Sequence, residues 1–220
     1  MKQELIVTED GSSSIYIPEM DETYHSTHGA IQEARHVFIE HGLKKVNQPS
    51  IRVLEMGFGT GLNALLTAIE CVDLSVRVGY IGVEAFPVEE EMINNLNYCS
   101  LIAGGCDSVF ERIHQTLWSI PQEINKFFTL TKIESKIQDY AIDSDFFDLI
   151  YFDAFGPRVQ SELWSEEVLQ KMHCGLKQGG ILVTYCAQGQ FKRNLKTVGF
   201  EVQTFPGPPG KREMTIALKR

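Results

Sequence analysis

Residues 51–63 read IRVLEMGFGTGLN, and this stretch decides the fold. The mainly apolar run Ile51–Met56 predicts a buried strand. The strand ends at the glycine-rich turn GFGTG, residues 57–61, and apolar side chains then recur at helical spacing over Leu62–Ile69. A strand, a tight glycine turn and a helix in this order are typical of the nucleoside-binding unit of α/β proteins.

Strand-like and helix-like stretches alternate along the rest of the chain. Strands are predicted at Val76–Val83, Phe127–Ile133, Phe147–Phe152 and Gly180–Tyr185, and helices at Gly29–His41, Asp107–Ile120, Ser161–Cys174 and Gln190–Val198, with an acidic helix start at Glu89–Glu91. This alternation implies parallel strands with helical crossovers, an α/β layered sheet. The last two predicted strands, Phe200–Phe205 and Glu213–Leu218, are joined only by PGPPG and should run antiparallel.

The composition indicates one compact domain. Of 220 residues, 43% are apolar and 22% charged. We expect an extended arm or small hairpin at residues 1–28 and the main domain at residues 29–220. Because no stretch approaches the ~18 consecutive apolar residues of a membrane span and the start lacks an apolar signal core, a cytoplasmic protein without membrane contact is expected. The oligomeric state is left open, with a monomer favoured.

The cysteines and histidines form no familiar site. The five cysteines are widely spaced and contain no C-x-x-C, so we interpret them as small buried hydrophobic residues. His25 and His28 have a spacing that metals accept, but no cysteine or H-E-x-x-H partner accompanies them. Neither a disulfide framework nor a metal site is expected.

The net charge of −9 argues against general attraction to nucleic acid. The charge is uneven, however: residues 51–150 hold 6 basic and 15 acidic side chains, whereas residues 151–220 hold 10 and 6. The basic final third could meet phosphates locally. The alternative is a solvated helix face and a charged tail.

The glycine turn follows a carboxylate, Glu55. The pattern E-x-G-x-G-x-G at residues 55–61 differs in spacing from the dinucleotide pattern G-x-G-x-x-G. Its glycines let the backbone approach a nucleoside, whereas the carboxylate repels a pyrophosphate and favours a ligand with ammonium and sulfonium groups. S-adenosylmethionine is such a ligand. A glycine-rich turn without any ligand is the alternative.

Two further acids follow predicted strands. Glu84 ends the strand after the glycine turn, about 20 residues beyond Gly61, where an acid binds ribose hydroxyls. Glu134, just past the next strand, is placed to approach the adenine amine. Asp139 competes for that role, and either acid could lie on the surface.

Asp153 follows the almost wholly apolar strand Phe147–Phe152 and should emerge at its C-terminal end. In methyl transfer to nitrogen, an amine lone pair attacks the sulfonium methyl, and a nearby carboxylate can orient the amine, stabilise the new ammonium and take its proton. Phe155 and Pro157 would shape an apolar lip beside it. An aspartate that only caps a helix or turn is the alternative.

Several stretches together resemble one family. They are Val53–Asn63, Asp21–Ser26, Phe152–Pro157 with Leu163-Trp164, and Gly210–Met214. In these the chain resembles the methyltransferase domain of the bacterial bifunctional tRNA 5-methylaminomethyl-2-thiouridine biosynthesis proteins and their stand-alone relatives. The resemblance implies a seven-stranded class I methyltransferase sheet with an antiparallel last strand.

The resemblance also implies a reaction: methylation by S-adenosylmethionine of the 5-aminomethyl group of wobble uridine 34, with the tRNA anticodon arm as partner. Cofactor contacts are expected at Glu55, Gly57, Phe58, Gly59, Thr60, Gly61, Asn63, Glu84, Glu134 and Asp153. Asp153 would also be the catalytic residue facing the amine, and Tyr24, Phe155, Pro157, Lys211 and Arg212 would flank the substrate.

The chain also departs from this family. The bifunctional proteins add an FAD-dependent oxidase domain, which is not expected in this chain. No FAD is therefore expected, and the aminomethyl group must come from another enzyme or another route. Ala154 stands where the longer proteins tend to have glycine. Three rivals remain: an N-methyltransferase acting on a small molecule or protein, a nonenzymatic S-adenosylmethionine-binding module, and a less favoured NAD oxidoreductase.

Overall fold

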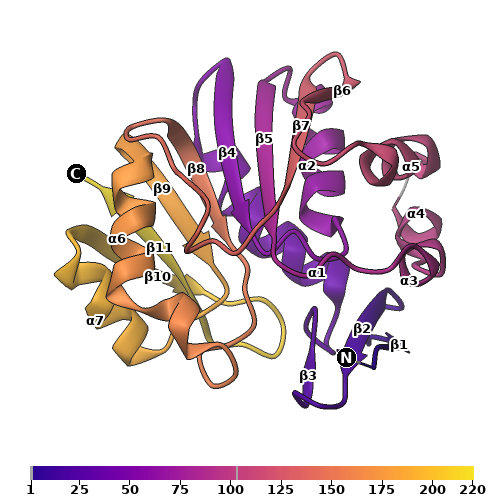
Figure 1. The fold of residues 1–220 in the computed structure, drawn as a ribbon, viewed down its shortest axis with the longest axis horizontal. Helices are drawn as coiled ribbons and strands as arrows, with labels where there is room; N and C mark the ends of the chain where they lie inside the picture. Colours follow the sequence, from indigo (N-terminus) through magenta and orange to yellow (C-terminus); the bar gives the residue numbers. More distant parts are fainter. Residues whose placement is uncertain (1, 103) are drawn as a thin grey trace.

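The computed structural model describes residues 2–102 and 104–220. An eight-stranded sheet lies at its centre in the order β10-β11-β9-β8-β4-β5-β7-β6 (Figure 1). The strands are β4 (Ser50–Met56), β5 (Arg77–Glu84), β6 (Gln122–Asn125), β7 (Phe128–Glu134), β8 (Phe147–Phe152), β9 (Leu176–Thr184), β10 (Phe200–Pro206) and β11 (Glu213–Lys219). Neighbours among β4, β5, β7, β8 and β9 pair in parallel, whereas β11 is antiparallel to both β9 and β10. The predicted α/β class and the antiparallel last strand are confirmed.

The edge strand β6 makes the sheet one strand wider than the seven expected. It pairs antiparallel with β7, and its sequence QEIN contains one buried apolar residue, Ile124. So short a strand with one apolar residue carries no alternating pattern. The expected number of seven strands is therefore corrected to eight, because β6 pairs with β7. The local sequence does not reveal this pairing.

Helices cover both faces of the sheet (Figure 1). One face carries α1 (Ala30–Ala34) with its π-helical continuation η1 (Arg35–Glu40), α2 (Leu62–Asp73) and α5 (Asp107–Gln115); the other carries α6 (Glu166–Gly175) and α7 (Gly189–Thr197). Short turns are η2 (Leu43–Lys45), α3 (Glu90–Asn94), α4 (Tyr98–Leu101) and η3 (Ser161–Trp164). Consecutive β4 residues serve the two cores, Val53 on the α2 side and Leu54 on the α6 side. Within the described ranges, no helix is long and apolar enough to cross a membrane.

The N-terminal arm forms its own small sheet. Its strands are β1 (Glu4–Val7), β2 (Ser13–Ile17) and β3 (Glu22–Thr23). Asp10 Oδ2 accepts a hydrogen bond from Gln32 N in α1 at 3.0 Å, and Asn97 Oδ1 accepts one from Ser13 N at 2.7 Å. The arm is therefore fastened to the main body on two sides.

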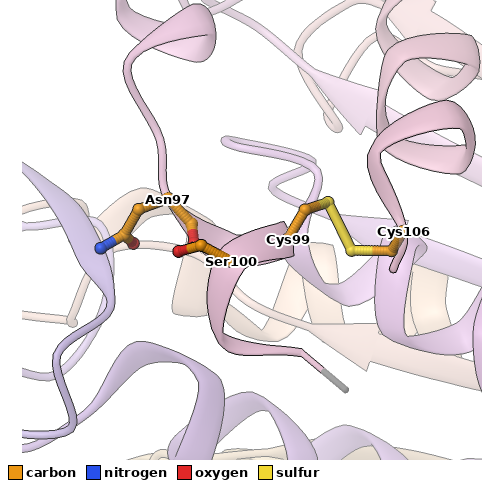
Figure 2. The surroundings of a disulfide bond; sticks show 4 residues. All are labelled: Asn97, Cys99, Ser100 and Cys106. Carbon is orange, nitrogen blue, oxygen red and sulfur yellow. A yellow bond between two sulfur atoms is a disulfide. The ribbon is translucent and has the colours of Figure 1, made fainter. Parts of the chain in front are cut away.

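The cysteine prediction is wrong for one pair. Cys99 and Cys106 form a disulfide that links α4 to the start of α5 (Figure 2). The two Cα atoms lie 5.1 Å apart, a proximity that the seven-residue separation alone does not indicate. Cys71 and Cys186 are buried as expected, whereas Cys174 is exposed.

Candidate active site

A cavity of about 730 Å³ lies at the C-terminal ends of β4, β5 and β8. The glycine turn, the arm, α1 and the turn between β10 and β11 complete its walls. Of the predicted site residues, it brings together Tyr24, Gly57, Phe58, Gly59, Thr60, Asn63, Glu84, Asp153, Phe155 and Lys211. Its volume falls within the range of about 300–1,000 Å³ that small-molecule sites occupy.

The glycine turn is packed against its neighbours through backbone. Gly57 has φ +89°, and a Cβ there would lie 2.0 Å from the carbonyl oxygen of Asp153. Gly59 has φ +48°, and a Cβ there would lie 3.1 Å from the Tyr24 ring. Only glycine fits both positions without strain. The ends of β4 and β8 can therefore lie next to each other, with the arm above them.

Glu84 is tied to the glycine turn. Its Oε2 accepts a hydrogen bond from Gly59 N and its Oε1 one from Phe86 N, each at 2.9 Å. Burial raises the pKa of Glu84, and the backbone N–H groups oppose this rise. The predicted ribose-binding carboxylate thus lies beside the turn, in the cavity wall.

Asn63 joins two of the predicted carboxylates. Its Nδ2 donates to Asp153 Oδ2 at 2.7 Å and to Glu55 Oε1 at 2.8 Å. Glu55 is fully buried and does not line the cavity, and burial raises its pKa well above the usual range. Within the described part of the chain, Glu55 Oε2 and Asn63 Oδ1 are buried atoms without a hydrogen-bond partner.

Asp153 lies in the cavity with an altered acidity. Burial, assisted by the negative charge of Glu33, raises the pKa of Asp153 to about 7. The hydrogen bond from Asn63 and the positive charge of Lys211 act in the opposite direction. A carboxyl group with this pKa can hold or release a proton near neutrality.

Histidine and tyrosine side chains connect the arm to the glycine turn. His25 Nε2 lies 3.4 Å from Thr60 Oγ1, which also accepts a hydrogen bond from the Tyr98 hydroxyl at 3.1 Å. Burial lowers the pKa of His25 to about 4, so the ring is neutral at pH 7. Tyr24 packs edge-on against Phe155 with ring centroids 5.1 Å apart. The arm is therefore a wall of the cavity.

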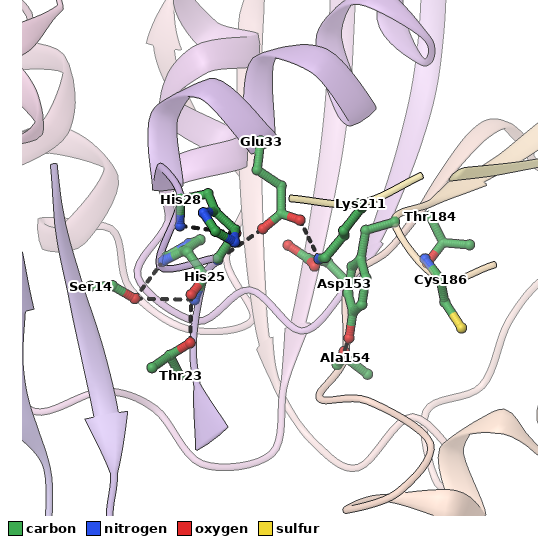
Figure 3. Close-up of polar contacts among 12 residues, drawn as sticks. Ser14, Thr23, His25, His28, Glu33, Asp153, Ala154, Thr184, Cys186 and Lys211 are labelled. Carbon is green, nitrogen blue, oxygen red and sulfur yellow. Dashed lines mark hydrogen bonds and ion pairs between the residues drawn. The ribbon is translucent and has the colours of Figure 1, made fainter. Parts of the chain in front are cut away.

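Glu33 and Lys211 form an ion pair at the same end of the cavity (Figure 3). Glu33 comes from α1, and Lys211 from the turn before β11. Lys211 Nζ also lies 3.8 Å from the centroid of the Tyr185 ring. No local sequence pattern marks Glu33, Tyr185 or His25 as residues of this site, because only the tertiary fold brings them to the cavity.

Five predicted site residues lie outside the cavity wall: Glu55, Gly61, Glu134, Pro157 and Arg212. Gly61 caps the start of α2 with φ +73°. Glu134 and its competitor Asp139 are exposed, and the loop between them, through Ser135 and Gln138, lines the cavity instead. Neither acid is part of the cavity wall, and the contact with adenine stays a prediction. Pro157 is half-buried and Arg212 is exposed.

His25 and His28 have different neighbours. His28 contacts Glu9 Oε2 at 3.0 Å, whereas His25 faces Thr60. Among the residues described, no three His, Cys, Asp or Glu side chains gather as they would around a metal ion.

Known proteins similar to this chain point to one chemistry. Residues 113–220 match a family described as S-adenosyl-L-methionine-dependent methyltransferase. The tRNA 5-methylaminomethyl-2-thiouridine biosynthesis bifunctional protein MnmC of Cupriavidus necator is 31% identical over 93% of this chain and 33% of its own length. The protein of the same name from Leptospira interrogans is 27% identical over 90% of this chain and 32% of its own length. The chain spans about a third of the length of these curated relatives.

Solved structures agree with these likenesses. The crystal structure of MnmC2 from Aquifex aeolicus is 25% identical, with a TM-score of 0.81 over 98% of this chain and 70% of that chain. Spermidine synthase from Thermotoga maritima, 14% identical, has a TM-score of 0.58 over 100% of this chain and 72% of that chain, which shows a shared fold alone. The predicted resemblance and the methyltransferase fold are confirmed.

Proposed function

We propose that this protein transfers a methyl group from S-adenosylmethionine to the 5-aminomethyl group of wobble uridine 34 in tRNA. The observation that carries the proposal is the single cavity in which the glycine turn, Glu84 and Asp153 meet. The substrate class is taken from the names of the similar proteins, which refer to the biosynthesis of 5-methylaminomethyl-2-thiouridine in tRNA. A tRNA substrate is consistent with a cytoplasmic enzyme, and we propose that it acts as a monomer.

The residues present fit S-adenosylmethionine. The glycine turn has no room for a Cβ at Gly57, so backbone alone faces the cavity there. Asn63 Oδ1, buried without a partner in the described structure, is an acceptor suited to an ammonium group. Glu84 would accept hydrogen bonds from the ribose hydroxyls. When bound, this cofactor supplies an electrophilic methyl group.

Asp153 is the proposed catalytic residue. Its carboxylate would accept a hydrogen bond from the substrate amine, direct the lone pair and receive the proton that the amine loses on methylation. A pKa of about 7 suits a group that must be ionised before the reaction and protonated after it. The hydrogen bond from Asn63 would fix which Asp153 oxygen faces the amine.

The arm and the main domain would both contribute residues to substrate binding. We propose that residues 29–220 form the methyltransferase domain and that residues 1–28 close its cavity. Tyr24 and Phe155, already in edge contact, would hold the uracil ring of a base turned out of the anticodon loop.

The ion pairs on the surface indicate which basic side chains are free to contact tRNA phosphates. Lys192 pairs with Glu213 and Lys219 with Asp145, so these cations are partly neutralised within the protein. Arg212 is exposed, which makes it the better candidate for a phosphate contact. Arg212→Glu should weaken tRNA binding.

The test is methylation in vitro. The protein is incubated with methyl-labelled S-adenosylmethionine and tRNA that carries 5-aminomethyluridine, and the nucleosides are then separated. Label in 5-methylaminomethyluridine supports the proposal. The matched control is the same tRNA with an unmodified wobble uridine, which should stay unlabelled. Cofactor binding without label in the aminomethyl tRNA would contradict the proposal and favour a small-molecule enzyme or a binding module.

A further inference from the structure

Three charged side chains from distant parts of the sequence meet at one end of the cavity. Glu33 lies in α1, Asp153 follows β8, and Lys211 precedes β11; Figure 3 shows them together. Lys211 Nζ forms its ion pair with Glu33. Within the described residues, no ion pair links Lys211 to Asp153. The cation is thus near Asp153 but held by another carboxylate.

Both members of the ion pair are fixed in place. Glu33 is 7% exposed, and its Oε2 also accepts a hydrogen bond from Ser26 N at 2.9 Å. Lys211 lies over the ring of Tyr185, whose hydroxyl donates to the carbonyl oxygen of Ala154 at 2.6 Å. Ala154 is the residue after Asp153. Lys211 is therefore connected to the Asp153 segment through Tyr185, whereas Glu33 is held by the arm through Ser26.

We infer that the Glu33–Lys211 ion pair is a positioning pair that sets the charge of Asp153, and that the two members act on it in opposite directions. This inference rests on the proposed function where it concerns the reaction. Two carboxylates in one poorly solvated cavity repel each other, and a single cation between them relieves that repulsion. Without Lys211, Asp153 would hold its proton more tightly; without Glu33, it would release it more easily.

Asp153 has further polar neighbours on several other elements. Asn63 of α2 is a neutral donor. Glu55 of β4 and Tyr80 of β5 have pKa values raised well above their usual ranges by burial, as has Tyr185 at the end of β9. His25 of the arm is neutral above pH 4.

Glu84, Glu22 and Glu162 are further carboxylates of the cavity wall. Glu84 is the one nearest the glycine turn, where it accepts a hydrogen bond from Gly59 N. Two backbone N–H groups hold it at the end of β5. Of the charged groups in the wall, Glu33 and Lys211 are the two that act on the acidity of Asp153.

The experiment is a carbon-13 NMR titration of aspartate carboxyl groups in the full chain without cofactor or tRNA, with Asp153→Asn used to assign the signal. Lys211→Met should raise the pKa of Asp153 by about one unit, and Glu33→Gln should lower it by a similar amount. Lys211→Arg keeps the charge and should leave it within about 0.3 units. Shifts in the same direction, or none, would overturn the inference.

A second measurement separates this inference from the proposed function. If Lys211→Met does not fold, Lys211→Gln removes the same charge with a smaller change in polarity. In the methylation reaction, the apparent pKa of the acid limb of the kcat/KM profile should move to higher pH for Lys211→Met and to lower pH for Glu33→Gln. If Asp153 titrates as expected but no tRNA is methylated, the pair stands and the proposed function fails. If methylation occurs and both variants have the same pH profile of kcat/KM as the unchanged protein, the role of the pair in the reaction is refuted.

Discussion

Strand β8 is bounded by two aspartates that are held in contrasting ways. Asp148, near its start, is 3% exposed, accepts a hydrogen bond from Arg52 N at 2.8 Å and pairs with Lys177 Nζ at 2.6 Å. Asp153, just past its end, accepts one amide hydrogen bond from Asn63 and faces the cavity. The first charge is neutralised within the fold. The carboxyl group of Asp153 has no cation paired with it among the described residues and can contact a molecule in the cavity. Burying such a group lowers the stability of the fold, as is typical of functional sites.

The largest expected effect comes from removing the available charge. Asp153→Asn should reduce kcat for tRNA methylation about 10³-fold, because the amide cannot take the proton of the amine. Calorimetric affinity for S-adenosylmethionine should stay within about threefold. Asp148→Asn, the same change at the other end of β8, should leave kcat per folded molecule within about twofold. A loss below tenfold for Asp153→Asn would remove the proposed distinction between the two aspartates.

The next effect is on stability and belongs to the neutralised charge. Asp148→Ala should lower the free energy of unfolding by about 2–3 kcal/mol, because it leaves the Arg52 N–H and the Lys177 ammonium without their acceptor. Urea unfolding followed by circular dichroism measures this. Lys177→Met removes only the exposed partner and should cost about 1 kcal/mol. Equal losses in the two variants would mean that the backbone hydrogen bond contributes nothing.

The smallest effect is the pH dependence of stability that Asp153 contributes. Its folded pKa of about 7 exceeds the value of about 3.9 in an unfolded chain, so the folded state binds more protons between these values. Its contribution to stability therefore falls as the pH rises from about 4 to 7. Asp153→Asn should consequently gain more stability at pH 8 than at pH 5, by about 2 kcal/mol in urea unfolding. An equal gain at both pH values would show that Asp153 titrates normally.

The contrast between the aspartates also marks how far sequence could go. Asp153 and Glu84 were predicted because each follows an apolar strand, and parallel strands bring such ends to one edge of the sheet. The glycine turn was predicted from the spacing of its glycines along the chain. These features depend on neighbours in sequence, and the structure has them all in one cavity wall.

Features that depend on distant segments escaped prediction. Glu33 and Tyr185 reach Asp153 only through the packing of α1 and β9, and the Cys99–Cys106 pair needs the turn between two short helices. Glu134 was expected in the site from its place at a strand end. Successive side chains of a strand point to opposite faces, so a position near the end of a strand does not fix the direction of its side chain.

The Glu33–Lys211 contact joins residues 178 positions apart, and this separation has a consequence for biosynthesis. A ribosome delivers α1 early and the β10–β11 hairpin last, so the carboxyl groups of Glu33 and Asp153 emerge well before the ammonium group of Lys211. A nascent chain can build most of the sheet while its reactive centre is still electrostatically incomplete. Under the proposed function, competence for the reaction would then arrive only with the segment that carries Lys211.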